Sequence, residues 1–201
     1  MTRRFASPPI CNAGTLGGNV ANGSPIGDSM PALICLGATV VLQNADGTRS
    51  LPLEDFYLDY MKKDLRPGEF VAAIRIPRAR PERVVRCYKI AKRFDQDISA
   101  VCGAFAVEMA ARRVQGARVC FGGMATTPRR ASACEAALTG TELEPAAIGR
   151  AIAALATDFQ PISDFRASQA YRLQVAGNLL RRFASEVLQP EVDTSVWSHA
   201  G

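Results

Sequence analysis

A segment rich in glycine and asparagine, residues 12–28, constrains this 201-residue chain more than any other feature. It holds five glycines, three asparagines and one proline. Such a composition predicts repeated turns, with several residues at positive φ, and no long regular element. The segment ends at Asp28, which we expect to be the N-cap of a helix that has Pro31 in its first turn and ends near Gly37.

The run Gly-Thr-Leu-Gly-Gly-Asn at residues 14–19 fits neither the dinucleotide fingerprint G-x-G-x-x-G nor the phosphate loop that ends in Gly-Lys-Ser/Thr. Two interpretations follow from the residues alone. Successive backbone N–H groups without bulky side chains can form a nest for an anion. The same run also suits a multi-turn connector beneath the edge of a sheet.

Strand signals come before helix signals along the chain, which predicts an α+β fold and not an alternating parallel sheet. In the first part, apolar runs separated by turn residues predict strands at residues 38–43, 48–53 and 70–76. A short helix is expected near residues 54–61.

The second part begins after a proline- and arginine-rich linker at residues 78–81. Strand-like segments occupy residues 84–91, 98–109 and 114–124. Three helices are expected beyond them: one with Thr127 as N-cap, Pro128 at its first position and Gly140 past its end, one that starts at Pro145, and one over the apolar positions of residues 173–187. We therefore expect three regions, residues 1–80, a C-terminal domain at 81–190 with a three-stranded antiparallel sheet and three helices, and a tail at 191–201.

Composition limits the classes of partner. The net charge of +5 permits an anionic cofactor, but aromatic residues make up only 7% of the chain and do not interleave with a basic patch, so nucleic acid is not expected. The run of charged residues 78–89 contains four arginines and Lys89 against one glutamate, and it either attracts an anionic nucleotide or maintains solubility. No stretch reaches the ~18 apolar residues of a membrane span, and the first residues do not form a signal peptide, so the cytoplasm is the expected location.

Histidine and cysteine usage disfavours catalysis by the chain's own side chains. The single histidine, His199, lies third from the end, which argues against serine triads, cysteine–histidine pairs and most zinc hydrolases. The six cysteines, none closer than fourteen positions to another, lack the close pairs of zinc or iron–sulfur sites and are expected to be reduced and buried. Reactivity is therefore expected from a cofactor, with no catalytic side chain and no metal site on this chain.

Four segments of the chain resemble the FAD-binding subunit of bacterial xanthine dehydrogenases, a branch of the molybdenum hydroxylase family. The first is the glycine-rich segment, which reads Asn-Ala-Gly-Thr-Leu-Gly-Gly-Asn-x-Ala-Asn-Gly-Ser-Pro-Ile-Gly-Asp. The others are Tyr-Lys-Ile-Ala-Lys-Arg-Phe-Asp-Gln-Asp-Ile-Ser-Ala-Val at residues 88–101, Phe-Gly-Gly-Met-Ala at 121–125 and Pro-Ile-Ser-Asp-Phe-Arg-Ala-Ser at 161–168. They occur in the family's order and lie between residues 12 and 168, so the resemblance extends over nearly the whole chain.

This resemblance implies a redox-enzyme component. In the family a purine (hypoxanthine or xanthine) is oxidised at a molybdenum centre, electrons pass through iron–sulfur clusters, and FAD delivers them to NAD. Residues 1–80 would form the second lobe of a two-lobe FAD-binding domain, and residues 81–190 the domain that follows it. The molybdopterin cofactor and the iron–sulfur clusters are expected on partner domains or on a large molybdenum-binding subunit.

The resemblance also implies cofactor-binding residues. Thr15, Leu16, Gly17, Gly18 and Asn19 would line the FAD, with the glycines offering backbone N–H groups to the diphosphate. Asp28 would accept a hydrogen bond from a cofactor hydroxyl, which a carboxylate does strongly. Further cofactor contacts are expected from Phe5, which would pack on the FAD, from Val71, which would touch the flavin ring, and from Lys89, which would lie near the polar edge of the ring.

Each of these side chains also has a purely structural interpretation. On that interpretation Asp28 is an ordinary helix N-cap, a role that it can combine with cofactor binding, Val71 is a core residue, and Lys89 is an outward-facing residue of an exposed sheet. The mixed-charge loop with Lys92, Arg93, Asp95 and Asp97 is either a solvated surface or, as in the family, a segment beside the flavin that influences access of NAD.

These residues do not include the first FAD lobe or the iron–sulfur domains of the family. We expect a fragment, the product of a late start codon or one half of a split subunit, which by itself is inactive, binds FAD weakly or not at all, and self-associates through an exposed apolar surface. Two alternatives remain open at this point: a non-catalytic remnant or assembly module without flavin, and a flavoprotein like the medium subunit of carbon monoxide dehydrogenase with a different electron acceptor.

Overall fold

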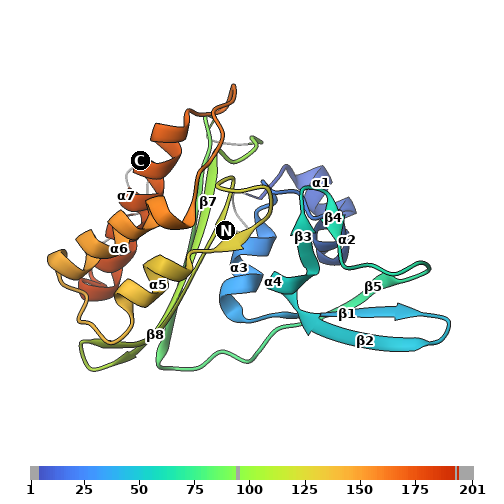
Figure 1. Ribbon diagram of the computed structural model, residues 1–201, viewed down its shortest axis with the longest axis horizontal. Coiled ribbons are helices and arrows are strands. Elements are labelled where there is room, and N and C mark those ends of the chain that lie inside the picture. The colour runs from blue at the N-terminus through green and yellow to red at the C-terminus, as the bar shows by residue number, and fades with distance from the viewer. Residues whose placement is uncertain (1–4, 94–95, 193, 195–201) are drawn as a thin grey trace.

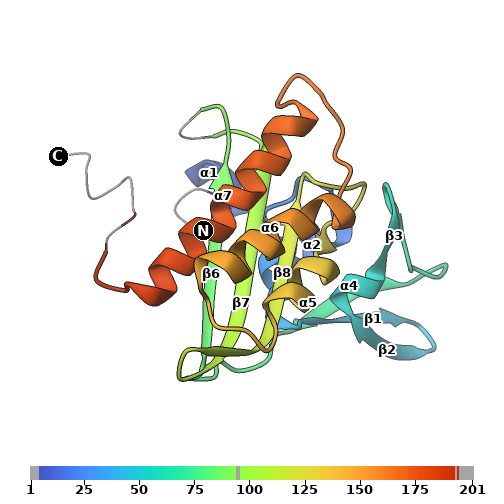
Figure 2. The same ribbon diagram turned by 60° about the vertical axis from the view of Figure 1, so that its left-hand side comes forward.

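The computed structural model describes residues 5–93, 96–192 and 194. His199 and Asp95, which entered the sequence predictions, lie outside these residues. Within the described residues the fold is α+β with antiparallel sheets, as predicted. Figures 1 and 2 show the long strands β6–β8 at the centre, with helices α5–α7 on one face and α3 with the N-terminal elements on the other.

The glycine-rich segment folds differently from the prediction. Its first two residues end the short helix α1 (Pro8–Ala13), its middle forms α2 (Leu16–Asn22), and only Gly23 within it is left-handed, with φ 63°. The segment has no long regular element, as predicted, but the prediction of repeated turns with several residues at positive φ was wrong, because turns occur only after α2, at residues 23–26. The hydroxyl of Thr15 caps α2, and this cap compensates for the low helix propensity of two glycines in the first turn.

The next element is α3 (Ser29–Leu36), which begins after Asp28 and ends at Gly37, left-handed with φ 74°. Both boundaries agree with the prediction. The helix is buried along most of its length because it packs against the strands β7 and β8. It thereby fixes the position of Asp28 at the point where the N-terminal part meets the central sheet.

A small sheet projects from the N-terminal part, in the order β2-β1-β5. Its strands are β1 (Thr39–Asn44), β2 (Gly47–Pro52) and β5 (Phe70–Arg75), close to the predicted ranges. The predicted helix near residues 54–61 is shorter: α4 spans only Leu53–Phe56, and β3 (Tyr57–Asp59) pairs with β4 (Lys62–Lys63). Tertiary contact ends the helix, since the Tyr57 hydroxyl donates a hydrogen bond to the Val20 carbonyl at 3.0 Å.

The C-terminal part is built on a sheet in the order β6-β7-β8-β9. The three long strands are β6 (Arg83–Ile90), β7 (Val101–Ala110) and β8 (Arg113–Gly122), and the short β9 (Arg129–Arg130) makes the sheet four-stranded, which corrects the predicted three. Because Arg129 and Arg130 pair with β8, the first helix does not start at Pro128. It is α5 (Ser132–Leu138), followed by α6 (Pro145–Asp158), which begins where predicted, and α7 (Gln169–Leu188).

The central sheet separates two apolar cores. On one face, Phe105 and Phe121 pack against Phe183 of α7 and Phe159 after α6, with ring centroids 5.2 to 5.6 Å apart. On the other face, Ala104, Ala106 and Cys120 pack against α3 and the N-terminal strands. Period-2 alternation of the strands produces this division, and it places Lys89 on the α3 face of β6, since Lys89 lies opposite Cys102.

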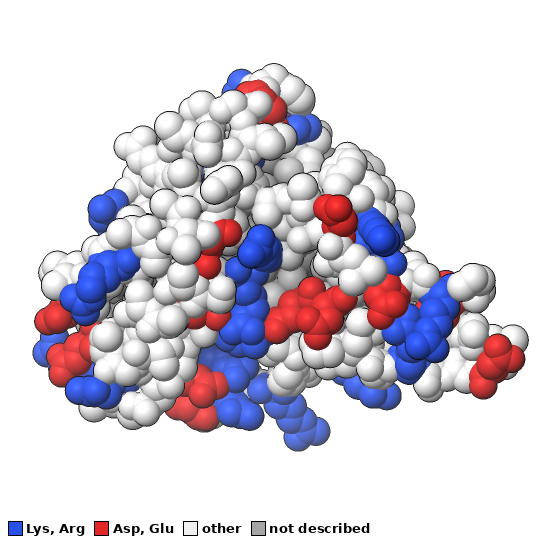
Figure 3. Space-filling view, in the orientation of Figure 1, with Lys and Arg blue, Asp and Glu red and all other residues white. Residues whose placement is uncertain are grey.

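Besides the apolar contact of α3 with the central sheet, charged side chains also connect the N-terminal part to the C-terminal part. Glu54 of α4 forms ion pairs with Arg118 of β8 and with Arg130 of β9, and Arg130 also pairs with Glu135. Figure 3 shows basic and acidic side chains intermingled across this face, without a large area of one sign. The basic run at residues 78–89 is likewise compensated: Arg80 and Arg83 pair with Glu108, and Arg86 pairs with Glu186.

Candidate functional site

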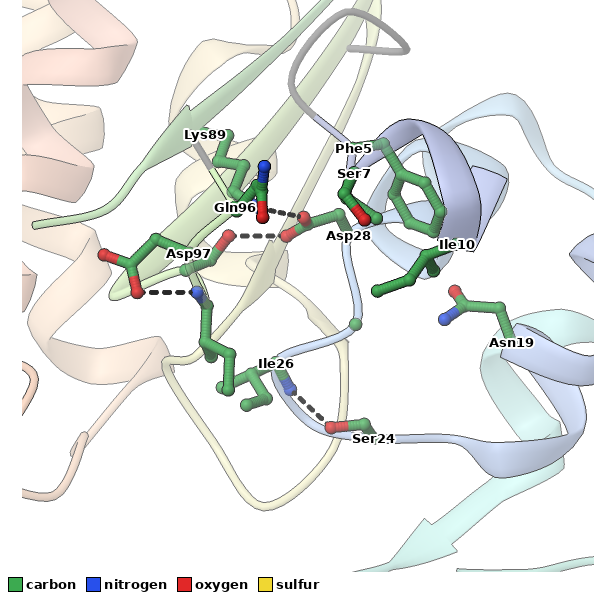
Figure 4. Close-up of a pocket in the computed structure, with 14 residues that line it drawn as sticks. Phe5, Ser7, Ile10, Asn19, Ser24, Ile26, Asp28, Lys89, Gln96 and Asp97 are labelled. Atoms are coloured by element: carbon green, nitrogen blue, oxygen red, sulfur yellow. Dashed lines mark hydrogen bonds and ion pairs between the residues drawn. The ribbon is translucent and has the colours of Figure 1, made fainter. Parts of the chain in front are cut away.

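A cavity of about 390 Å³ lies between the N-terminal segment and the loop that joins β6 to β7. In Figure 4, Lys89, Gln96 and Asp97 lie on one side of Asp28, while Phe5, Ile10 and Asn19 lie on the other. The complete lining consists of Phe5, Ala6, Ser7, Ile10, Asn19, Ser24, Ile26, Gly27, Asp28, Lys89, Gln96, Asp97, Ile98 and Ser99. The cavity therefore joins an apolar wall to a group of charged and amide side chains, which is the usual composition of a small-molecule site.

Asp28 is a buried carboxylate in the wall of the cavity. The residue is 6% exposed, and its side chain makes no cap bond to α3. One carboxylate oxygen accepts a hydrogen bond from Lys89 Nζ at 2.7 Å, and the other accepts one from Ser99 Oγ at 2.5 Å. Asp28 is thus the N-cap residue by position only, and its carboxylate lines the cavity instead of capping the helix.

The alternative interpretation placed Lys89 on an exposed sheet face, but in the structure its side chain does not face solvent. Its side chain is 7% exposed, and its ammonium group is ion-paired with Asp28. The opposite charge of Asp28 offsets part of the cost of burying the lysine. The pair links β6 to the start of α3, residues 61 positions apart in the sequence.

Asn19 reaches the cavity from α2, where its side-chain oxygen accepts a hydrogen bond from the Ser29 hydroxyl. The remaining residues of the α2 start lie outside the cavity and form a helix instead of a nest. Thr15 Oγ1 accepts from the Gly18 N–H at 2.9 Å, and Thr15, Leu16 and Gly18 are exposed to solvent.

Val71 also lies outside the cavity. It is half-buried on β5, where it packs against the core on the α3 face, and β5 lies against α2. Of the nine cofactor-binding residues predicted from the sequence, the cavity brings together Phe5, Asn19, Asp28 and Lys89. It does not include Thr15, Leu16, Gly17, Gly18 or Val71.

The sequence prediction missed most of the wall that comes from the β6–β7 loop. Gln96, Asp97, Ile98 and Ser99 line the cavity. The Asp97 carboxylate accepts hydrogen bonds from the backbone N–H groups of Arg93 and Ile98, and these bonds lower its pKa below the usual value. These residues fall inside the second family-like segment, in which the resemblance names only Asp97, as part of the loop that would influence access of NAD, and gives no role to Gln96, Ile98 or Ser99.

The cysteines fit the predicted reduced state, since within the described residues none of the six belongs to a disulfide. Burial raises the pKa of Cys35 and Cys120 well above the usual value, and that of Cys134 to about 12, so these thiols are unreactive. Two of the six depart from the prediction of burial: Cys11 is exposed and Cys87 is half-buried.

The described residues contain no group of three or more histidine, cysteine, aspartate or glutamate side chains placed to hold a metal ion. None of the helices in residues 5–93 and 96–192 has the length and apolar character needed to cross a membrane.

Comparison with known proteins gives two family matches. Residues 1–79 match the FAD binding domain in molybdopterin dehydrogenase, and residues 86–187 match the CO dehydrogenase flavoprotein C-terminal domain. The chain thus belongs to the FAD-binding flavoprotein family of the molybdenum hydroxylases.

Individual relatives agree with this family. The carbon monoxide dehydrogenase medium chain of Afipia carboxidovorans is 36% identical over 89% of this chain, and a xanthine dehydrogenase of Emericella nidulans is 33% identical over 92% of it. A solved Cu,Mo-CO dehydrogenase superposes with a TM-score of 0.84 at 32% identity, covering 90% of this chain. The chain spans 62% of the Afipia protein, 14% of the Emericella protein and 63% of the solved chain.

The cavity residues fit part of an FAD molecule. A volume of about 390 Å³ lies near the lower end of small-molecule sites, about 300–1,000 Å³, so it admits a portion of so large a cofactor. The Asp28 carboxylate retains lone pairs beyond the two that Lys89 and Ser99 occupy, because two oxygens offer about four acceptor positions. It can therefore accept a hydroxyl hydrogen bond as well.

Proposed function

We propose that this chain holds FAD in the cavity at Asp28 and Lys89 and serves as the flavin-carrying part of an electron-transfer chain in a molybdenum hydroxylase. The observation that carries the proposal is the buried Asp28–Lys89 ion pair in the wall of a cavity, within a chain of this family. A protein does not gain stability from such a pair as readily as from apolar packing, so its place in a cavity favours a role in binding.

The roles of the chain's own residues follow from their positions. Asp28 would accept a hydrogen bond from a cofactor hydroxyl, and Lys89 would place positive charge beside the ligand. Phe5 and Ile10 would exclude water from one side of the bound portion, and Asn19 would offer its amide. When bound, FAD supplies the ability to take up and release electrons singly or in pairs.

Cofactor contacts outside the cavity remain part of the proposal. Gly17 and Gly18 lie in the first turn of α2, where N–H groups favour negative charge, and Thr15, Leu16 and Val71 lie near them or on the neighbouring β5. We propose that the diphosphate end of FAD extends over this turn while the other end occupies the cavity.

We further propose that electrons arrive from iron–sulfur clusters, leave to NAD, and originate in purine oxidation at a molybdenum-binding large subunit. Similarity to xanthine dehydrogenases supports this assignment, as does the sequence of residues 88–101. The whole enzyme would reside in the cytoplasm. The chain would divide near residue 80 into an FAD-binding lobe and a C-terminal domain, followed by a tail from residue 191.

A second candidate is a flavoprotein of the carbon monoxide dehydrogenase type, with a different electron acceptor. The 36% identity to a medium chain of that enzyme and the structural similarity favour it. The two candidates are distinguished by supplying the purified complex with a substrate and with either NAD or an artificial electron acceptor. Reduction by xanthine with NADH formation supports the purine enzyme, and turnover with artificial acceptors but not with NAD supports the second candidate.

The proposal is tested by purifying the chain with a C-terminal tag from the cells that make it and recording the absorbance spectrum. A flavin band supports the proposed function. A preparation that contains the iron–sulfur and molybdenum-binding partners but no flavin refutes it and favours a non-catalytic module.

A further inference from the structure

Ser99 lies at the end of the β6–β7 loop, in the wall of the cavity, and no role follows for it from the family matches. We infer that Ser99 is a positioning residue, which fixes the orientation of the Asp28 carboxylate toward the cofactor. The inference rests on the proposed function and adds to it a residue of the β6–β7 loop that controls the affinity of the site.

The contacts of Asp28 support this role. Ser99 is 1% exposed, and its hydroxyl donates to one Asp28 oxygen at 2.5 Å, while Lys89 Nζ lies 2.7 Å from the other oxygen. Two donors on different oxygens define the plane of a carboxylate, whereas one donor leaves it free to turn. With Ser99 in place, the remaining lone pairs of Asp28 have fixed directions.

The backbone around Ser99 is itself held firmly. The Ala100 N–H donates to the Ile90 carbonyl at 2.8 Å, which closes the loop between the two strands. The Ala100 carbonyl accepts a hydrogen bond from the guanidinium of Arg172, a residue of α7 that is 1% exposed and is also paired with Asp164 at 2.7 Å. The backbone that carries the Ser99 hydroxyl toward Asp28 is therefore held in place by β6 and α7 of the C-terminal domain.

The contacts of this loop end explain why a serine suits the position. Ser99 and Ala100 precede β7, where the chain bends, and the Ser99 hydroxyl donates to Asp28 while the Ala100 carbonyl accepts from Arg172. A small side chain with a donor satisfies Asp28 without filling the cavity. Alanine would keep the shape and remove only the hydroxyl.

The test uses the tagged complex after its flavin has been removed and FAD is titrated back, with binding followed by fluorescence. Ser99→Ala is expected to raise the Kd for FAD about ten-fold, which corresponds to about 1.4 kcal/mol, and to shift the visible flavin spectrum. Ser99→Thr, which restores a hydroxyl, is expected to return both quantities toward the wild type, and Ser99→Cys, a weak donor, to give an intermediate Kd. Ser132→Ala is the matched control, since Ser132 is exposed and also contacts an aspartate, Asp158 at 3.4 Å, remote from the cavity.

Three results would overturn the inference. The first is an unchanged Kd and spectrum in Ser99→Ala while Asp28→Asn loses FAD, which leaves the proposed function intact. The second is an increase in Kd that neither Ser99→Thr nor Ser99→Cys reverses while circular dichroism shows folded chains, which indicates a packing role. The third is a wild-type complex that never binds FAD, which refutes the proposed function together with the role of Ser99.

Discussion

Asp28 and Lys89 show how two residues acquire a shared role through the fold. The two residues lie far apart in the sequence, and each charge is expensive to bury alone. The register of β6 and the start of α3 bring them to 2.7 Å, within the wall of the cavity. The pair is therefore both a contact between the two parts of the chain and the polar centre of the site.

Replacing Asp28 with asparagine tests both roles of the pair, the contact between the two parts of the chain and the polar centre of the site. The variant leaves the Lys89 ammonium buried without its carboxylate, and loss of one partner of a buried pair costs about 3–5 kcal/mol of folding stability. We expect a lower denaturation midpoint in urea and no detectable FAD in the purified complex.

The double variant Asp28→Asn/Lys89→Met supplies the control for this prediction. It removes the buried ammonium group together with the carboxylate and should recover most of the lost stability without recovering FAD. Recovery of FAD binding in the double variant would show that Asp28 acts only through folding.

Single-residue patterns predicted some of this site and not the rest. The resemblance led to Asp28 and Lys89 by their motifs. Ser99 could not be found in the same way, because its importance arises from a contact with a residue 71 positions away. A serine after an isoleucine carries no signal of that contact in one sequence.

The first turn of α2 is the element that best tests why glycines occur in this segment. A Cβ added at Gly17 would meet no atom within 4 Å, and Gly17 is not left-handed, so nothing in the fold requires glycine there. Gly17→Ala should therefore stabilise the chain without cofactor by about 0.5–1 kcal/mol, the usual gain in a helix. If FAD extends over this turn, the same variant should weaken FAD binding several-fold in the titration described above.

Gly18→Ala provides the comparison, since its Cβ would lie 2.9 Å from Thr15 Oγ1 and disturb the cap. We expect that variant to lose stability instead. Equal FAD affinity in Gly17→Ala and wild type would contradict a cofactor contact at this turn.

The edge of the small sheet carries a charge cluster that should govern the response to acid. Arg49 of β2 pairs with Glu69 at 2.7 Å and with Asp64 at 2.8 Å. The Arg49 guanidinium lowers the pKa of Glu69 from its usual 4.5 to about 2, and it lowers that of Asp64 as well. Because the pKa is lower in the folded chain, the stabilising contribution is complete above about pH 4.5 and is lost as the pH falls toward 2.

Arg49→Gln should therefore reduce the free energy of unfolding at pH 7 and flatten its decline between pH 4.5 and 2, as measured by urea denaturation. Arg75→Gln is the control, because Arg75 lies on the neighbouring β5 and contacts only the Ser50 hydroxyl among the described hydrogen bonds, at 3.4 Å. An identical acid profile in Arg49→Gln and wild type would contradict the role of the cluster.

Element boundaries were predicted best where local chemistry determines them. The left-handed Gly37 ends α3, and Pro145 begins α6, as the sequence indicated. The predictions failed where long-range pairing overrides local preference. Thr127 and Pro128 resemble a helix start, yet the following arginines pair with the edge of β8, and Tyr57 ends α4 by bonding to Val20.

The whole molecule exposes several large apolar side chains on its N-terminal part. Ile10, Leu16, Leu58, Tyr60 and Phe70 are each about half exposed or more. Apolar side chains in such numbers mark surfaces that bind other proteins or promote association. We therefore expect the chain without partners to self-associate as its concentration rises.

Sedimentation velocity over a hundred-fold range of concentration measures this behaviour. Replacing Leu58 and Phe70 with serine should shift the distribution toward the monomer, since both side chains are exposed and absent from the cores. A monomer at every concentration in the wild type would contradict the expectation.

We propose that this family member holds FAD at the Asp28–Lys89 cavity, and the sharpest test is the flavin spectrum of the complex purified through this chain from its own cells. We expect a flavin band in the wild-type complex with its iron–sulfur and molybdenum-containing partners, and no flavin band in Asp28→Asn. A wild-type complex that contains these partners but no flavin, or a flavin band that persists in Asp28→Asn at wild-type occupancy, would contradict the proposal.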